Sequence, residues 1–524
     1  MIIPPFRLPS HPTGTISRRR SRTSAALEWR HFPPTRRGPY TARMATREAR
    51  AGRSSCRGSF VLALLFAFTA SCDASGTPPA YRMTLDVNYA EGTFCGELIL
   101  TYENHSNAPL EEIFFRLCAN ARSLYGSASL DVGEARADGE SVLVSLFADN
   151  TVLWVPLARP LVPGASAEIT LSFLGRAATP PPAGEFSSET EYGLLLKSAH
   201  TFTLTAFYPS VAPYTEEGWA IDPVSALGDA LFADSATYDV TVRVESEVTV
   251  IPTADEVMVE PDGRTLHSFH RGALRDFPLV LVDDGRQPLA TTAAGITLRS
   301  WFSPQHAQAA DIALQRGGAA IEVFSSRFGS LPYKAVDMVE VPLQRVAGVE
   351  CSGLFLVSAA YAARPRDVFF DIIVSHEMAH QWFYAVVGND PTEEPWLDEA
   401  LATYASNIFL AVISPTVAQS ERSTWAALYD RTRRDYPDLR VTSPLYDFPT
   451  SAAYSAFVYS GGALELDAIR RDVGDQLFFQ GLAEYYADYA LGIASGADLF
   501  ASLSRACACP LSSALFGSQS ATGP

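Results

Sequence analysis

Lysine is nearly absent from this sequence, and no apolar run is long enough to cross a bilayer comfortably. Among the 40 basic residues only Lys197 and Lys334 are lysines. Residues 1–57 contain thirteen arginines and two acidic residues, which give this region a net charge of +11. Since the whole chain has a net charge of −18, the remaining residues carry −29. A body this acidic lacks the basic surface that a nucleic-acid backbone needs, so nucleic acid is excluded as a partner.

Cysteine is also scarce. Two of the seven, Cys56 and Cys72, lie in the N-terminal region, and the body keeps an odd number with no C-x-x-C pair. This argues against a thiol-based metal site. In an oxidising compartment Cys95 and Cys118 are a plausible pair between neighbouring strands, and Cys507 and Cys509 are either disulfide partners in the tail or free thiols.

The N-terminal region has the order of an export signal. Residues 59–71, SFVLALLFAFTAS, form a short apolar run that follows several arginines and precedes small residues. A buried helix or a single membrane anchor is the alternative, but thirteen residues are too few to span a bilayer comfortably. We therefore expect residues 1–75 to be a leader, with a misplaced translation start before Met44. The mature protein would be extracytoplasmic: secreted, periplasmic or lipid-anchored to a bacterial cell envelope.

The end of this region, Thr69-Ala70-Ser71-Cys72, resembles a bacterial lipobox, whose cysteine is lipidated after cleavage. The leucine usual three places before the cysteine is missing. Membrane attachment through a lipidated Cys72 and plain secretion therefore both stay open.

Beyond the leader, the pattern of apolar residues and turn residues changes once. From about residue 80 to 290 it predicts short strands separated by turns, which is typical of a β-sandwich. After about residue 300 it predicts helices, which indicates a second, mostly helical domain. The sequence thus predicts an α+β protein with a leader at 1–75, a β-sandwich domain at 76–295, a catalytic domain at 296–515 and a disordered tail at 516–524.

The segment His376-Glu377-Met378-Ala379-His380 lies late in a predicted helix that begins near Asp367 and ends before Gly388. Histidines four residues apart project from one face of a helix, where both can bind one tetrahedral Zn²⁺. After eighteen residues comes Glu399, on a second helix opened by Pro395. We predict that His376, His380 and Glu399 hold one Zn²⁺ per chain and leave a fourth position for water or a substrate carbonyl.

Glu377 lies beside the open position and is predicted to accept a proton from the zinc-bound water as that water attacks the scissile carbonyl. Asp398 and Thr403 are candidates to orient the ligands, because both lie close to Glu399 in the sequence.

These motifs resemble the membrane alanyl aminopeptidase family of gluzincin metallopeptidases, in which HExxH is followed after eighteen residues by Glu within WLxEgfAtY. The second part here reads WLDEALATY, from Trp396 to Tyr404. The resemblance spans about residues 80–510 and implies a β-sandwich packed on a thermolysin-like zinc peptidase domain, with the active-site cleft between them. It points to a short, bacterial-type member without the family's C-terminal helical domain.

The resemblance also assigns residues outside the zinc signature. Gly348-Val349-Glu350 looks like the family's exopeptidase motif, whose Glu binds the substrate's free α-amino group. Tyr459 stands at the position of the catalytic tyrosine, which donates to the developing oxyanion, and Tyr454 is its nearest rival. Cys351 and Ser352 depart from the family pattern, which leaves the choice between exopeptidase and endopeptidase open.

The sequence therefore predicts an exported zinc-dependent aminopeptidase that acts on peptides. The alternatives are a zinc endopeptidase of the same fold and a non-catalytic, lipid-anchored gluzincin scaffold. The side-chain preference, the physiological substrate and the oligomeric state are not readable from the sequence.

Overall fold

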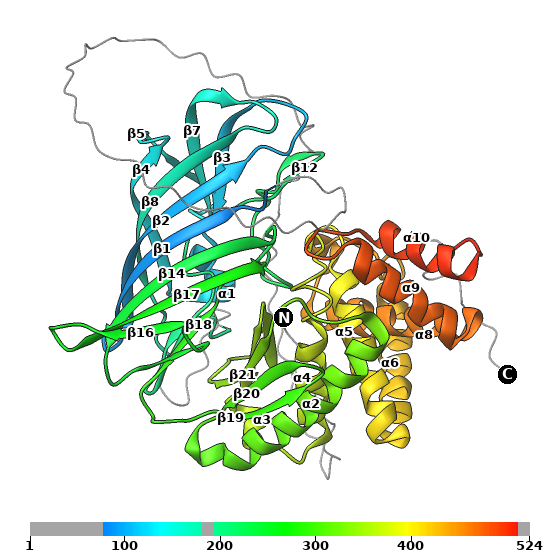
Figure 1. Cartoon of the computed structure of the whole chain (residues 1–524). Helices are drawn as coiled ribbons and strands as arrows, with labels where there is room; N and C mark the ends of the chain where they lie inside the picture. Colours follow the sequence, from blue (N-terminus) through cyan, green and yellow to red (C-terminus); the bar gives the residue numbers. More distant parts are fainter. Residues whose placement is uncertain (1–76, 181–191, 512–524) are drawn as a thin grey trace, which may run out of the picture. The chain divides into compact units, whose positions relative to one another are not determined.

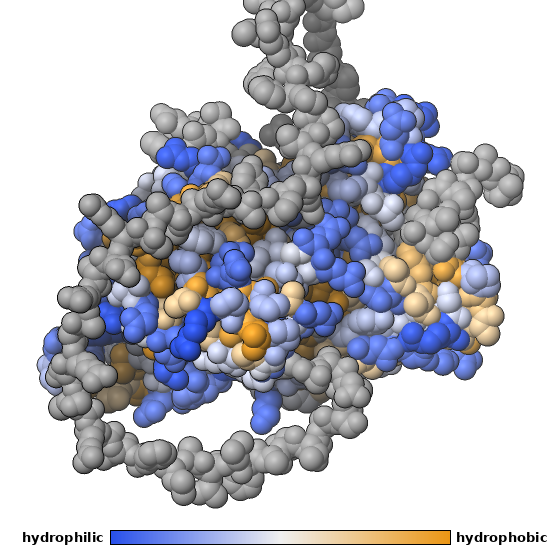
Figure 2. Space-filling view, turned by 90° about the horizontal axis from the view of Figure 1, so that it is seen from above, coloured by the Kyte–Doolittle hydropathy of each residue, from blue (hydrophilic) through white to orange (hydrophobic). Residues whose placement is uncertain are grey.

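The computed structural model describes residues 77–180 and 192–511, which belong to one compact unit. The predicted leader over 1–75, with its apolar run and Cys72, and the predicted tail over 516–524 lie outside the described residues. Within 77–180 and 192–511, no helix combines the length and the apolar character needed to cross a membrane. The face that Figure 2 shows is mostly hydrophilic, with apolar residues in separate small groups.

The first part of the described chain is a β-sandwich (Figure 1). Its strands alternate buried and exposed side chains, as half-buried strands do; in β8, Ala167, Ile169, Leu171 and Phe173 are buried. The eight-stranded sheet has the order β16 (Glu256–Val259), β17 (Arg264–Leu274), β14 (Ala236–Glu245), β1 (Ala80–Asn88), β2 (Thr93–Glu103), β8 (Ser166–Arg176), β4 (Ser129–Ala137), β5 (Glu140–Ser141).

Two four-stranded sheets share one hydrophobic core with the eight-stranded sheet. One has the order β15 (Thr249–Ile251), β18 (Leu279–Val282), β10 (Thr201–Leu204), β9 (Leu195–Lys197). The other has the order β11 (Ser210–Val211), β3 (Leu110–Arg116), β7 (Val152–Leu161), β6 (Ser145–Phe147). A small hairpin of β12 (Tyr214–Thr215) and β13 (Gly218–Trp219) and the short helices η1 (Cys118–Asn120) and α1 (Arg122–Tyr125) complete this part.

A five-stranded sheet follows, in the order β19 (Leu289–Ala293), β20 (Ile296–Trp301), β21 (Ala335–Val341), β23 (Leu354–Ser358), β22 (Gly348–Cys351). One of its faces, with Val349 and Leu356, belongs to the core of the sandwich, and the other, with Met338 and Phe355, belongs to the core formed by the helices. The sheet therefore lies between the sandwich and the helices. The predicted boundary at 295–296 falls in the turn between β19 and β20, which pair with each other.

The helical part covers the other face of this sheet and continues to the end of the described chain (Figure 1). The longer helices are α2 (Ala307–Phe328), α4 (Val368–Ala379), α5 (Trp396–Ile413), α6 (Pro415–Asp435), α8 (Gly462–Val473), α9 (Asp475–Asp488) and α10 (Gly496–Cys507). The short ones are η2 (Pro304–His306), α3 (Ala359–Ala362), η3 (Leu445–Asp447), α7 (Ser451–Tyr454) and the π-helical segment η4 (Ser455–Gly461).

The predicted α+β class, a β-sandwich followed by a mostly helical domain, is confirmed. Two local details differ from the regular pattern that the sequence suggests. Residues 142–144, between β5 and β6, form no strand, and Leu143 among them is 89% exposed and has no core to pack against. The zinc-binding helix ends at Ala379, well before Gly388, although residues 382–387 are apolar and buried.

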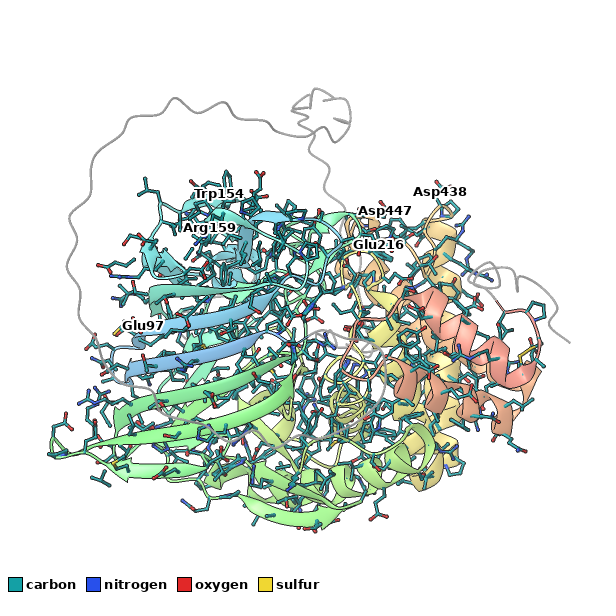
Figure 3. The ribbon with its side chains drawn as sticks, turned by 45° about the horizontal axis from the view of Figure 1, so that its top comes forward. Glu97, Trp154, Arg159, Glu216, Asp438 and Asp447 are labelled. Atoms are coloured by element: carbon teal, nitrogen blue, oxygen red, sulfur yellow. A yellow bond between two sulfur atoms is a disulfide. The ribbon has the colours of Figure 1, made fainter. Side chains whose placement is uncertain are left out.

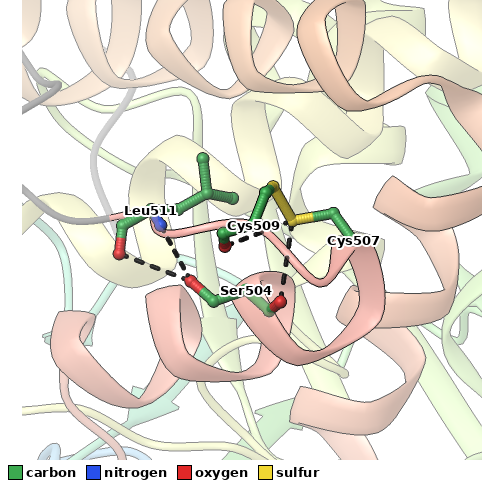
Figure 4. The surroundings of a disulfide bond; sticks show 4 residues. All are labelled: Ser504, Cys507, Cys509 and Leu511. Atoms are coloured by element: carbon green, nitrogen blue, oxygen red, sulfur yellow. Dashed lines mark hydrogen bonds between the residues drawn. A yellow bond between two sulfur atoms is a disulfide. The ribbon is translucent and has the colours of Figure 1, made fainter.

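The cysteines also differ from one expectation. Cys507 and Cys509 form a disulfide at the end of α10, beside the hydrogen bonds that join Ser504 to Leu511 (Figure 4). Cys95 and Cys118 do not pair: Cys95 is exposed on β2, whereas the Cys118 thiol is buried and donates to the carbonyl of Ala230 at 3.3 Å.

Candidate metal centre and active site

Helix α4 carries the two histidines of the HExxH motif. The Asp367 side chain caps its start by accepting a hydrogen bond from the Phe369 N–H at 3.1 Å. Its buried residues pack against α2, α5 and β22. His376 lies in the last turn and His380 directly after it, so the helix end holds both imidazoles one turn apart.

Helix α5 supplies the third residue. Glu399 lies in its first turn, where the N-terminal end of the helix dipole favours a carboxylate. The side chain is fully buried. Of the two residues predicted to orient it, Asp398 accepts from the Glu399 N–H at 2.8 Å, whereas the Thr403 hydroxyl has no hydrogen-bond partner within the part of the chain that the structure describes.

The three side chains meet in a geometry that fits Zn²⁺. The Nε2 atoms of His376 and His380 are 3.0 Å apart, and they lie 3.3 and 3.6 Å from Glu399 Oε2. A tetrahedral zinc ion with ligands at 2.0–2.1 Å separates its ligand atoms by about 3.3 Å. The triangle of donor atoms therefore already has the size that a bound zinc ion requires.

The protonation of these groups fits a metal as well. His380 Nδ1 lies 3.0 Å from the carbonyl oxygen of Phe383, which can only accept, so Nδ1 carries the proton and Nε2 keeps its lone pair. Burial lowers the pKa of His376 and brings the pKa of His380 to about 4, so both rings are neutral at pH 7.

Glu377 points into the same centre. Its side chain is fully buried, and its carboxylate accepts no hydrogen bond from any residue in 77–180 or 192–511. Burial raises the pKa of Glu377 well above its usual value. A buried carboxyl group that is not used for structure is free to exchange a proton with a substrate or a water molecule.

The space for this carboxylate is made by Gly348 on the edge strand β22. A Cβ atom on residue 348 would lie 2.3 Å from Oε1 of Glu377 and 2.6 Å from its Cδ. Gly348 thus keeps the strand close to the carboxylate, while Val349, which we had grouped with it for substrate binding, turns its side chain into the sandwich core.

We expect Gly348→Ala to lower kcat/KM by about a hundredfold, because a shift of about 1 Å in a catalytic group costs this much. The melting temperature should fall as well, because the Cγ of the fully buried Glu377 also lies 2.6 Å from the added Cβ and the whole side chain must move. Gly318→Ala is the control, because its Cβ would have 3.8 Å of space. Peptidase kinetics and thermal melts check this; equal activity of the two variants would contradict it.

Glu350 lies on the same strand and reaches the centre. One atom each of Glu350, Glu377 and His380 lie within 4.8 Å of one another, and all three side chains are buried. Two carboxylates this close repel each other, and a cation between them relieves the repulsion. The position therefore suits the α-amino group of a peptide.

The two residues that depart from the family pattern hold this edge strand in place. Ser352 accepts from the Arg275 N–H at 3.0 Å through its hydroxyl and donates its own N–H to Asp276 at 2.7 Å. The carbonyl of Cys351 accepts from Gln381 at 3.0 Å, one residue after the second histidine. The Cys351 thiol is buried and packs in the core, with a pKa raised by burial.

Tyr459 lies in the π-helical segment η4. Its hydroxyl donates to Glu399 Oε1 at 2.6 Å, and its ring stacks on His376 with 5.9 Å between centroids. The rival, Tyr454, packs its ring edge against Tyr459 at 5.9 Å. The structure thus brings Tyr459 to the metal ligands and places Tyr454 behind it.

One residue that sequence reasoning missed joins the sandwich to this centre. Arg275 follows β17 and is 3% exposed. Its guanidinium donates to the carbonyls of Ala233, Tyr384, Val386 and Gly492 at 2.6, 2.7, 3.3 and 2.9 Å. Gly388 leaves room for it, since a Cβ there would lie 2.3 Å from the guanidinium carbon.

Known proteins resemble the part of the chain that carries this site. The profile of the peptidase family M1 domain matches residues 312–516. The matched residues carry the donor triangle together with Glu350, Glu377 and Tyr459, and this part of the chain resembles the M1 peptidases. Aminopeptidase 2 of Candida albicans is 24% identical over 452 residues, 82% of this chain and 45% of that protein. Probable aminopeptidase 1 of Saccharolobus solfataricus is 22% identical over 78% of this chain and 51% of that protein.

Among solved structures, the M1 zinc metallopeptidase from Deinococcus radiodurans has the same fold, with a TM-score of 0.58 and 20% identity over 82% of this chain and 90% of that one. A variant of it is described as bound to a Tyr-Ser-Ala substrate. The chain spans about half, or less, of the length of the curated M1 relatives it matches.

Proposed function

We propose that the chain is a zinc-dependent aminopeptidase that removes N-terminal residues from peptides. The observation that carries this proposal is the triangle of His376, His380 and Glu399 donor atoms with the Glu350 carboxylate at a fixed place beside it. Zinc at this triangle would supply Lewis acidity, which activates a water molecule and polarises a carbonyl. We propose one Zn²⁺ per chain. The resemblance to the M1 peptidases and the peptide bound by the Deinococcus protein support the substrate class.

The residues of the chain divide the remaining work. Glu350 would bind the free α-amino group, so that only the first peptide bond reaches the centre. Glu377 would accept a proton from the attacking water and pass it to the leaving amine as the C–N bond breaks. Tyr459 would turn its hydroxyl from Glu399 towards the oxygen on which negative charge develops.

We also propose that the protein is exported, as a secreted, periplasmic or Cys72-lipidated form. The order of arginines, apolar run and small residues before residue 75 supports this. The disulfide between Cys507 and Cys509 suits an oxidising compartment.

The test compares free and N-acetylated peptides on zinc-loaded protein. We expect acetylation to lower kcat/KM by about a hundredfold and Glu350→Gln to raise the KM of free peptides by about tenfold to a hundredfold, since a charged hydrogen bond contributes about 1.5–3 kcal/mol. A chelator should abolish turnover and Zn²⁺ should restore it. Equal cleavage of both peptides would favour the endopeptidase, and zinc-loaded protein without any turnover would favour the scaffold.

A further inference from the structure

The strand that carries Glu350, β22, lies at the edge of the five-stranded sheet. The Ser358 N–H donates to the Ala347 carbonyl at 2.9 Å. Hydrogen-bonded pairs alternate along an antiparallel ladder, so Gly348 directs its own N–H and C=O away from β23. An extended peptide can add to the edge of a sheet through such groups. The outer edge of β22 is therefore a surface along which a substrate can bind.

The far end of β22 is closed. Ser352 is 4% exposed and is hydrogen-bonded to the Arg275 N–H and to Asp276, and the Gly353 N–H donates to Gln381 at 2.9 Å. A peptide with its α-amino group at Glu350 would therefore extend the other way, past Gly348 and towards the loop that precedes β22.

Arg345 is the first exposed residue in that direction, because Ala347 and Val346 are buried. Its φ is 62°, and the Val346 N–H donates to the Gln344 carbonyl at 2.8 Å. Arg345 is thus the central residue of a γ-turn with positive φ, which is rare and strained for a residue that has a side chain. Backbone strain of this kind is concentrated at functional sites.

The sandwich holds this loop in place. The Gln344 N–H donates to the Tyr192 carbonyl at 3.0 Å. The neighbouring Gly193 packs so closely on the loop that a Cβ there would lie 3.3 Å from the Cα of Leu343. The backbone of Arg345 therefore has a defined position before any ligand binds, which lowers the entropy that binding costs.

Electrostatic interactions connect Arg345 with the metal centre. Burial raises the pKa of Tyr192, and the charge of Arg345 opposes this rise, so the two side chains are near each other. Tyr192 also interacts electrostatically with Tyr454, whose ring packs on Tyr459 with 5.9 Å between centroids. Arg345 thus belongs to the surroundings of the same centre as Tyr459.

These surroundings carry many carboxylates. Glu350 and Glu377 lie in the centre itself. Figure 3 labels further ones that are exposed: Glu216, Asp438 and Asp447. Arg275 is buried and its guanidinium is bound to backbone carbonyls. Arg345 supplies an exposed cation in a place where a substrate carboxylate would otherwise be repelled.

We propose that Arg345 binds the C-terminal carboxylate of short peptides and so determines which peptides the centre prefers. The inference rests on the proposed function and adds its substrate class, short peptides with a free C-terminus. Arg345 precedes Glu350 by five residues, and an extended peptide rises about 3.4 Å per residue, so peptides of about three to five residues fit between them. A guanidinium can hold a carboxylate with two parallel hydrogen bonds. It would also attract an acidic side chain beyond the scissile bond, which the experiment separates.

The test compares tripeptides Xaa-Gly-Gly, with alanine, leucine, arginine or phenylalanine first, with the same peptides as C-terminal amides. On zinc-loaded protein we expect kcat/KM for the acid to exceed that for the amide by about tenfold to a hundredfold, mainly through KM, as one charged hydrogen bond provides. In Arg345→Gln the two values should become nearly equal, and Arg345→Lys should keep part of the preference. Arg366→Gln is the control, since it removes an exposed arginine at the opposite end of α4 from His376, and it should keep the wild-type ratio.

Binding of the acids and amides to zinc-loaded protein, measured by calorimetry, separates this inference from the proposed function. Turnover with equal binding and equal kcat/KM of acid and amide overturns the role of Arg345 and leaves the aminopeptidase standing. Tighter binding of the acid that depends on Arg345, without any turnover, does the opposite. A preference that survives in Arg345→Gln, or a loss that is equal for acid and amide, also overturns the role of Arg345.

The amides Xaa-Asp-Gly and Xaa-Asn-Gly separate the two sources of a carboxylate. They have no free C-terminus and differ in the charge of the second side chain. We expect the Asp and Asn amides to differ less than the acid and amide of Xaa-Gly-Gly. A preference for Asp that depends on Arg345, without one for the free acids, would overturn the assignment to the C-terminus.

Discussion

Glu377→Gln is expected to lower kcat by about 10²- to 10⁴-fold, the usual contribution of a general base, while the zinc content stays at the wild-type level. The amide has the shape of the carboxyl group but cannot accept a proton from water. The donor triangle of His376, His380 and Glu399 does not include Glu377, so metal binding should survive. Steady-state kinetics together with metal analysis of the purified variant measure both quantities.

The control is Glu322→Gln, the same chemical change at an exposed position on α2. It should leave kcat, zinc content and the melting temperature unchanged. A Glu377→Gln variant that turns over peptides as fast as this control would remove the proton-transfer role from Glu377. Loss of zinc together with activity would mean that Glu377 acts through the metal site and not on the substrate.

Arg275→Ala is expected to lower the free energy of unfolding by about 3 kcal/mol or more, because it leaves three buried carbonyl oxygens, and a partly buried fourth one at Gly492, without their charged donor. Two of these carbonyls belong to Tyr384 and Val386, in the turn that follows the zinc-binding helix. Urea unfolding of the full chain, followed by tryptophan fluorescence, measures the change.

Arg271→Ala is the matched control four residues earlier. Its side chain is 25% exposed, and its guanidinium pairs with the exposed Asp255 at 2.6 Å, so its loss should cost less than about 1 kcal/mol. If Arg275→Ala does not fold, Arg275→Lys keeps the charge but cannot reach all four carbonyls, and it should still be less stable than the wild type. Equal stability of the Arg275 and Arg271 variants would refute the role given to Arg275.

The metal centre was predictable because its residues are marked by short sequence motifs on two neighbouring helices. The spacing of His376 and His380 follows from one turn of helix, and Asp367 and Pro395 mark where the two helices begin. Glu350 and Tyr459 had no such signal and were found through resemblance to the family. Their closeness to His380 and His376 depends on the pairing of β22 and on the π-helical turn, which no spacing rule encodes.

The residue that sequence reasoning missed acts across the fold. Arg275 reaches the turn after the zinc-binding helix from the sandwich, far from the HExxH motif in the chain, and only the packed structure shows its contacts. The premature end of α4 has the same origin. Residues 382–387 are apolar and could continue the helix, but Arg275 binds two carbonyls of this stretch, and in a helix those carbonyls would point to other backbone groups. The sequence of a short apolar run such as β21 or β23 does not tell a buried strand from a buried helix, because both are apolar on every side.

The π-helical segment η4 makes the position of Tyr459 depend on the number of residues before it. A π turn holds one residue more than an α turn, so Ser455–Gly461 contains a one-residue surplus relative to an ordinary helix. Removing one residue, such as Ala456, would restore the 3.6-residue repeat and rotate the following side chains by about 100° about the helix axis relative to those before it. Tyr459 and the whole of α8 could not both keep their present neighbours. The extra residue thus sets the rotation of α8 about its axis relative to the residues before it. With it, the buried face of α8 packs on the core while the phenol of Tyr459 still faces Glu399.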